Sequence, residues 1–72
     1  FDLPNQRRVS LIVYDIQGRR VRSLIEGELP AGHYALRWDG RNDARKPVSS
    51  GVYFCRMVAD DFKKSLKLVL LK

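Results

Sequence analysis

The chain of 72 residues holds one cysteine and one histidine, the two side chains that a thiol nucleophile and its base would supply. Cys55 lies inside the apolar run from Val52 to Val58, where a small buried thiol is the expected role. His33 follows Gly32 at a turn, far from Cys55 along the chain, and no motif surrounds either residue. A metal role for His33 is not expected, because no second histidine or cysteine completes a ligand set.

The densest polar cluster is the pentapeptide Asp39-Gly-Arg-Asn-Asp43. A calcium loop gathers about six to eight oxygen ligands, with acidic or amide side chains at every second position before a glycine. Here those side chains stand at positions 39, 42 and 43, and Gly40 comes too early. Asx turns that organise a loop explain the cluster better. The sequence also lacks a phosphate-binding glycine loop and a Ser-His-Asp arrangement, so we expect no enzymatic activity, no metal and no cofactor.

The net charge of +6, from 14 Lys and Arg against 8 Asp and Glu, requires that a nucleic-acid partner be considered. The basic residues occur in short groups between acidic ones, without zinc-finger spacing, a stacking-aromatic motif or a long basic run. A solvated basic surface is therefore expected, and no nucleic acid. No apolar run approaches the ~18 residues of a membrane-spanning helix, so membrane insertion is not expected.

Turn-forming residues recur about every 8–12 residues, a spacing that is typical of an all-β sandwich or barrel. The run from Arg8 to Tyr14 alternates, and one face carries the apolar side chains of Val9, Leu11 and Val13. The residues from Asp15 to Gly18 are expected to close a hairpin, because Gly18 tolerates positive φ and Asp15 bonds the backbone two residues on. The return strand from Arg19 to Glu26 breaks the alternation, which predicts a bulge.

The second half of the chain continues this pattern. A type II turn is expected at Pro30–Gly32, then a strand from His33 to Trp38 and a loop from Asp39 to Ser50. The next predicted strand, Gly51 to Val58, carries one face made of Tyr53, Cys55 and Met57. Inward placement of large side chains favours core packing over a carbohydrate-binding face for the aromatic residues. In the predicted strand from His33 to Trp38 the inward residues are Tyr34, Leu36 and Trp38. The other aromatic residues considered for a carbohydrate-binding face are Tyr14, Tyr53 and Phe54.

The segment from Asp60 to Lys72 admits two interpretations. Apolar residues alternate as in a strand at Leu66, Leu68 and Leu70. A second set shares one face of a helix that Asp60 would cap, and this set is Phe62, Leu66, Val69 and Leu70. A basic amphipathic helix would bind a membrane surface or a partner groove. A two-residue turn at Asp60-Asp61 between two apolar runs favours a hairpin, so a final strand is expected.

Several short stretches carry, in order, the likeness to a known family: Val9-Ser-Leu-Ile-Val-Tyr-Asp15 with Gly18-Arg-Arg-Val21, Leu29-Pro-Ala-Gly32, Trp38-Asp-Gly-Arg41, Ser50-Gly-Val-Tyr-Phe54 and Lys67-Leu-Val-Leu-Leu-Lys72. Along essentially its whole length the chain resembles the FlgD-like immunoglobulin-type domains of the bacterial flagellar hook-capping scaffold. It is also similar to the type A C-terminal sorting domains of the type IX secretion system. The structural signature of the resemblance consists of Gly18, Gly32, Trp38, Asp39 and Gly40.

The resemblance implies one domain over residues 1–72, an immunoglobulin-like antiparallel β-sandwich of about six to seven strands without catalytic residues. It implies a C-terminal module of a larger exported bacterial protein, which acts as a sorting or anchoring signal for secretion. The partners would be the secretion machinery or neighbouring protein subunits, with cargo domains on the N-terminal side. The location would be the cell surface or the exterior, reached through the periplasm of a Gram-negative-type bacterium. The sorting or interaction motif would be Gly51, Tyr53, Lys67, Leu68 and Lys72.

The sequence departs from the family pattern at three places. Family members have a further strand ahead of position 1, so the first family strand is expected to be missing, and an open sheet edge would then allow self-association or strand addition. Arg45 and Lys46 stand where the loop usually has a glycine, and Cys55 stands where an aromatic residue is more common.

Two other functions remain open from the sequence. One is a structural assembly domain, in a hook-capping scaffold or a surface filament, whose contact with a neighbouring subunit is itself the function. The other is a module that binds a carbohydrate or a polyanion.

Overall fold

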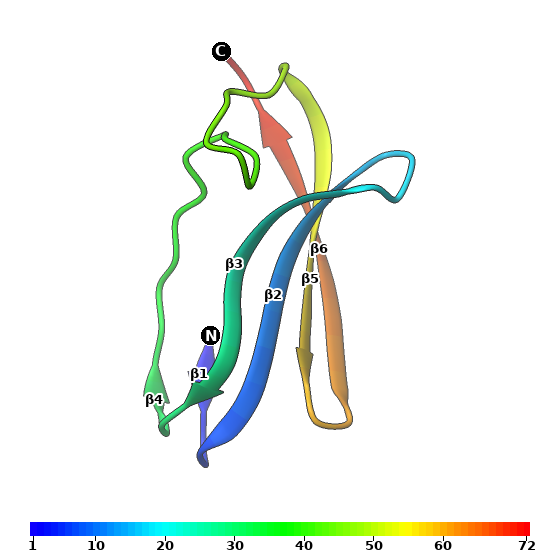
Figure 1. Cartoon of the computed structure of the whole chain (residues 1–72). Helices are drawn as coiled ribbons and strands as arrows, with labels where there is room; N and C mark the ends of the chain where they lie inside the picture. Colours follow the sequence, from blue (N-terminus) through cyan, green and yellow to red (C-terminus); the bar gives the residue numbers. More distant parts are fainter.

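The computed structural model describes all 72 residues, and its regular elements are strands only. In chain order the strands are β1 (Asp2–Leu3), β2 (Arg7–Asp15), β3 (Arg20–Leu29), β4 (Gly32–His33), β5 (Gly51–Ala59) and β6 (Phe62–Leu70). Four of them form one antiparallel sheet in the order β3-β2-β5-β6, and β1 and β4 pair as a second, two-stranded sheet (Figure 1). No helix is long and apolar enough to cross a membrane. Two antiparallel sheets confirm the all-β class and fit an immunoglobulin-like sandwich.

The centre of the large sheet follows the alternation of the sequence. Val9 and Val13 on β2 are fully buried, and Leu11 between them is buried as well. Their cross-strand partners on β5 are inward-facing too, because Val13 lies opposite Cys55 and Leu11 opposite Met57. The two central strands thus contribute most of the core, as their period-two pattern predicts.

The β2–β3 hairpin is closed by the expected polar turn. The Asp15 carboxylate accepts hydrogen bonds from the amides of Gln17 and Arg19, both at 2.9 Å, and Gly18 has φ +81°. The register between β2 and β3 shifts twice, between Leu11 and Ile12 and again between Val13 and Tyr14. These shifts confirm the predicted irregularity of the return strand.

The C-terminal segment is a strand, and the helical interpretation of residues 60–72 is therefore wrong. β6 pairs with β5 in one unbroken register, from Ala59 opposite Phe62 to Gly51 opposite Leu70. The hairpin turn has two residues, and its first residue, Asp60, adopts φ +53°. A helix is excluded because the inward side chains of β6 follow a period of two across the whole strand.

The second layer of the sandwich is thin. Leu3 of β1 packs in one buried cluster with Val9 and Ala59 of the large sheet. Phe1 and Tyr34 stack beside this cluster with ring centroids 5.2 Å apart. From β4 the chain continues as an irregular extended segment that leads to the opposite end of the large sheet, where β5 begins (Figure 1).

The predicted strand from His33 to Trp38 is wrong, because regular pairing ends at His33. Beyond His33 the backbone of Tyr34 exchanges two 2.7 Å hydrogen bonds with Phe1, and residues 35–38 pair with no strand. Tyr34 and Trp38 are half-buried and Leu36 is exposed, so the predicted inward row is only partly covered. The type II turn is also wrong: with Pro30 at its second position the turn needs a positive φ at Ala31, and the only non-glycine residues with positive φ are Arg45 and Asp60.

Candidate interaction site

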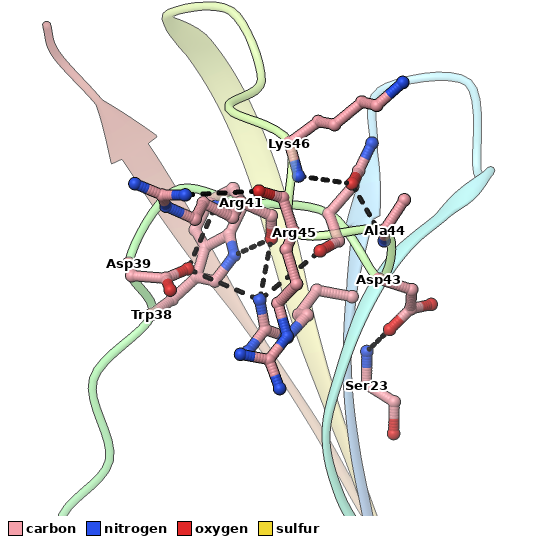
Figure 2. Close-up of polar contacts among 10 residues, drawn as sticks. Ser23, Trp38, Asp39, Arg41, Asp43, Ala44, Arg45 and Lys46 are labelled. Atoms are coloured by element: carbon pink, nitrogen blue, oxygen red, sulfur yellow. Dashed lines mark hydrogen bonds and ion pairs between the residues drawn. The ribbon is translucent and has the colours of Figure 1, made fainter.

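The loop that precedes β5 is held together by side chains that bond the nearby backbone (Figure 2). The Asp39 carboxylate accepts a hydrogen bond from the Arg41 amide at 3.0 Å. The side-chain oxygen of Asn42 accepts bonds from the amides of Ala44 at 3.0 Å and Lys46 at 3.1 Å. These are the Asx turns that the sequence indicates. No group of three or more His, Cys, Asp or Glu side chains is placed to share a metal ion.

Asp43 fastens the loop to β3. Its carboxylate accepts a hydrogen bond from the Ser23 amide at 2.9 Å (Figure 2). Its own amide donates to the Val21 carbonyl at 2.9 Å. The bond from Ser23 is the main reason that the pKa of Asp43 lies below its ordinary value of 3.8, and the positive charges of Arg20 and Arg22 act in the same direction. The loop thereby occupies backbone groups of β3 that no neighbouring strand pairs.

Trp38 and Gly40 set the loop over one end of the sheet. The Trp38 indole N–H donates to the Arg41 carbonyl at 2.8 Å, and its ring meets Tyr53 of β5 edge-on with centroids 5.0 Å apart. Gly40 is buried at φ +74°, and a side chain there would meet Leu70 of β6 at 3.3 Å. These contacts close that end of the sandwich. The other signature glycines lie in separate places, the β2–β3 turn and β4 (Gly18 and Gly32).

Arg22 of β3 organises the same region, and the sequence pattern did not identify it. Its guanidinium donates to the carbonyls of Arg41 at 3.4 Å and Asn42 at 3.3 Å, and it lies 3.5 Å from the Asp39 carboxylate. Its side chain is only 17% exposed. The sequence did offer one signal, since Arg22 lies on a predicted strand without clean alternation. A charged side chain that is partly buried on such a strand requires polar partners from another segment.

An apolar groove lies open between the large sheet and the irregular segment that follows β4. It has a volume of about 520 Å³. Leu36 on one side is 47% exposed and Leu66 of β6 on the other is 54% exposed, so the two layers do not close over it. Its lining is mainly apolar and includes Tyr34, Trp38, Cys55, Met57, Leu68 and, from β6, Lys64.

β6 forms one edge of the large sheet, and its only neighbour is β5. Phe62 is 50% exposed and Val69 is 61% exposed. None of the ion pairs of the molecule involves the lysines of this strand, which are Lys63, Lys64 and Lys67. The edge therefore combines exposed apolar side chains with positive charges that no acidic side chain neutralises.

The residues predicted as a sorting or interaction motif fall on and just after the β5–β6 hairpin. Tyr53 of β5 and Leu68 of β6 lie directly opposite each other. Gly51 lies two residues before Tyr53, Lys67 directly precedes Leu68, and Lys72 follows the end of β6. The structure thus brings four of these residues together on adjacent strands. The amide of Lys72 donates to the Ser50 hydroxyl at 3.0 Å, which ties the chain end to the start of β5.

Cys55 and His33 both line the groove, but no hydrogen bond joins them. Burial raises the pKa of the Cys55 thiol, which therefore stays protonated, in its unreactive form, at neutral pH. The Nδ1 atom of His33 lies 2.6 Å from the Asp2 carboxylate on the surface. The pair has none of the geometry of a thiol nucleophile with its base.

Comparison with known proteins identifies the family to which the chain belongs. The family model described as FlgD Ig-like domain matches residues 2–62, which include β1 to β5 and the first residue of β6. No curated protein and no solved structure matches the chain. The match confirms the FlgD-like immunoglobulin-type resemblance of the sequence over most of the chain. The chain therefore belongs to the family of FlgD Ig-like domains.

Proposed function

We propose that this chain is a structural assembly domain, whose contact with a neighbouring subunit is its function, as in a flagellar hook-capping scaffold or a surface filament. The carrying observation is the edge strand β6, which is nine residues long and unpaired on its outer side. Folded proteins usually shorten, bulge or cover such an edge, because its free backbone groups invite pairing with another chain. Membership of the FlgD Ig-like family supports an assembly function more than it supports binding of a carbohydrate or a polyanion.

The exposed apolar side chains of β6 support the same function. Phe62 and Leu66 point to the same side of the sheet, since they lie opposite Ala59 and Cys55 of the inward face. Both are half-exposed, and Leu66 lines the apolar groove. Covering apolar area removes it from water at about 25 cal/mol per Å², so a partner on this side gains free energy.

A test in the bacterium uses the protein that carries this domain. The double variant Phe62→Ser/Leu66→Ser removes the two exposed apolar side chains on the groove side of β6 and leaves the buried core intact, and Lys46→Ser on the distant loop is the control. Export is followed by immunoblotting, and assembly by the fraction that sediments with surface structures. The proposal expects normal export with assembly lost in the double variant only. Normal assembly of the double variant would overturn it.

A sorting signal is the second candidate, and its supporting observation is the grouping of the motif residues on β5 and β6. The same experiment separates the two functions, because a sorting surface predicts that the double variant stays inside the cell. Fusion of residues 1–72 to a reporter in a cell with type IX secretion is the direct test. Retention of the reporter in the cell would count against sorting.

A further inference from the structure

The backbone geometry of the β5–β6 hairpin determines which groups of β6 are free. In an antiparallel hairpin with a two-residue turn, the residues that flank the turn form a hydrogen-bonded pair, here Ala59 and Phe62. Hydrogen-bonded and non-bonded positions then alternate along the strand. The N–H and C=O groups that point away from β5 therefore belong to Lys63, Ser65, Lys67 and Val69. No hydrogen bond outside the sheet uses any of them.

The side chains of β6 form two rows beside these free groups. The inward row continues into the apolar groove through Leu66 and Leu68. The outward row carries Lys63 and Lys67, four residues apart on one face. A strand added along this edge would direct alternate side chains into the groove and the others toward the two lysines.

Charge decides what kind of strand fits. Six of the eight acidic side chains are already paired with a basic residue, whereas Lys63, Lys64 and Lys67 have no acidic partner. A second copy of β6, paired antiparallel about Ser65, would place Lys63 of one copy directly opposite Lys67 of the other. Like charges directly opposite each other are destabilising in a sheet. Pairing of two copies in this central register is therefore disfavoured, whereas an acidic strand in the same place would find opposite charges at both lysines.

We infer that the free edge of β6 accepts an extended segment of a different protein subunit, in which apolar residues alternate with acidic ones. This inference rests on the proposed assembly function and specifies the partner of its surface. The acidic residues face Lys63 and Lys67, with a third near Lys64, and the apolar residues enter the groove beside Leu66 and Leu68. Backbone bonds to the free groups supply affinity, and the two rows of side chains supply selectivity.

The test uses a labelled peptide designed for antiparallel pairing with residues 70 to 62, Val-Thr-Val-Glu-Val-Thr-Glu-Glu-Val. The control peptide has lysine in place of each glutamate and is otherwise identical. Fluorescence anisotropy with the full chain at low ionic strength should show the acidic peptide binding at least about tenfold more tightly, from two to three favourable cross-strand charge pairs. Equal binding of the two peptides, or binding of neither, would overturn the inference.

Ser65→Pro tests whether the edge itself is used. Proline removes an N–H that points away from β5, so the ladder to β5 keeps its bonds, and such positions on edge strands tolerate proline. Ser65→Thr keeps the N–H and serves as the control. We expect Ser65→Pro to lose peptide binding and Ser65→Thr to keep it, with circular dichroism unchanged in both. Binding that survives in a folded Ser65→Pro chain would place the peptide elsewhere and overturn the inference.

A charge exchange keeps the test decisive if Ser65→Pro does not fold. The double variant Lys63→Glu/Lys67→Glu should reverse the preference and bind the lysine peptide more tightly. An unchanged preference would overturn the inference, and so would dimerisation of the unaltered chain through β6 at low ionic strength. If no peptide binds while Phe62→Ser/Leu66→Ser still abolishes assembly in the cell, the inference fails and the assembly function stands. If the acidic peptide binds but that variant assembles normally, the assembly function fails.

Discussion

β3 and β6 are the two edges of the same four-stranded sheet, and they are built in opposite ways. Register shifts interrupt β3, the loop residue Asp43 bonds its backbone at Val21 and Ser23, and Arg20 pairs with Glu26 and Asp43. β6 has an unbroken register, no covering loop along its middle, and lysines without acidic partners.

The difference leaves only one of the two sheet edges open to pairing with another strand. Bulges, charges and a covering segment are the devices with which proteins stop edge-to-edge pairing, and β3 has all three. β6 relies on lysines alone, which repel another basic strand but attract an acidic one. Under the proposed function, one protected and one open edge would limit pairing to a single side, which suits an assembly contact that must not extend into an unlimited sheet.

The largest expected effect is the loss of the contact that closes the covered end of the sandwich. Trp38→Ala removes the packing on Tyr53 and the bond to the loop, and should cost about 3 kcal/mol of unfolding free energy. Leu36→Ala, on the open side of the groove, should cost less than about 1 kcal/mol because that side chain is half-exposed. Urea unfolding followed by tyrosine fluorescence or circular dichroism measures both. Equal losses would mean that the two ends of the groove are covered alike.

A smaller effect is expected from the cation that fastens the loop beside β3. Arg22→Met removes the donors to the Arg41 and Asn42 carbonyls, and should cost about 1.5 kcal/mol. Lys67→Met on β6 is the matched substitution at the other edge, and it should leave the unfolding free energy nearly unchanged because Lys67 has no ion pair. The contrast between the edges would be contradicted if Lys67→Met proved the more destabilising of the two.

The pH dependence of stability should come from two carboxylates, Asp43 beside β3 and Asp15 at the β2–β3 turn. Hydrogen bonds from Ser23 and from Arg19 hold the pKa values of Asp43 and Asp15 below 3.8. A carboxylate with a lowered pKa stabilises the fold above its unfolded-state value, and this contribution disappears as the pH falls through the lower folded value. The temperature at the midpoint of thermal unfolding should therefore decrease as the pH is lowered below about 3.8. This decrease should be less steep in Asp43→Asn, which has no carboxylate at position 43. An identical acid profile for Asp43→Asn would show that the loop bond does not depend on the charge.

Local patterns predicted the sheet well because each strand in it has a neighbour. The alternation of β2 and β5 and the turns at Gly18 and Asp60 needed only short-range rules. The segment after His33 alternates as clearly, yet it is irregular: a strand also requires a partner, and no strand pairs with residues 35–38. Propensity alone does not reveal such a missing neighbour.

The candidate site was harder to predict for a similar reason. The motif residues on β5 and β6 were identified from the family resemblance, but strand order decides that β6 is an edge, and strand order is not a property of any single segment. The partners of Arg22 could not be predicted, because all three lie in a loop that begins 17 residues later. The groove is lined by residues far apart in the sequence, from the segment after β4 and from β5 and β6, so no local pattern could predict it.

Amide hydrogen exchange, resolved by residue with NMR, tests most directly whether the sheet has one open and one closed edge. Within β6 we predict that the amides of Lys63, Ser65 and Lys67 exchange at least about tenfold faster than those of Lys64 and Leu66, because only the latter bond to β5. On β3, the Ser23 amide should be protected by its bond to Asp43. Uniform protection along β6, or rapid exchange at Ser23, would contradict this difference between the two edges.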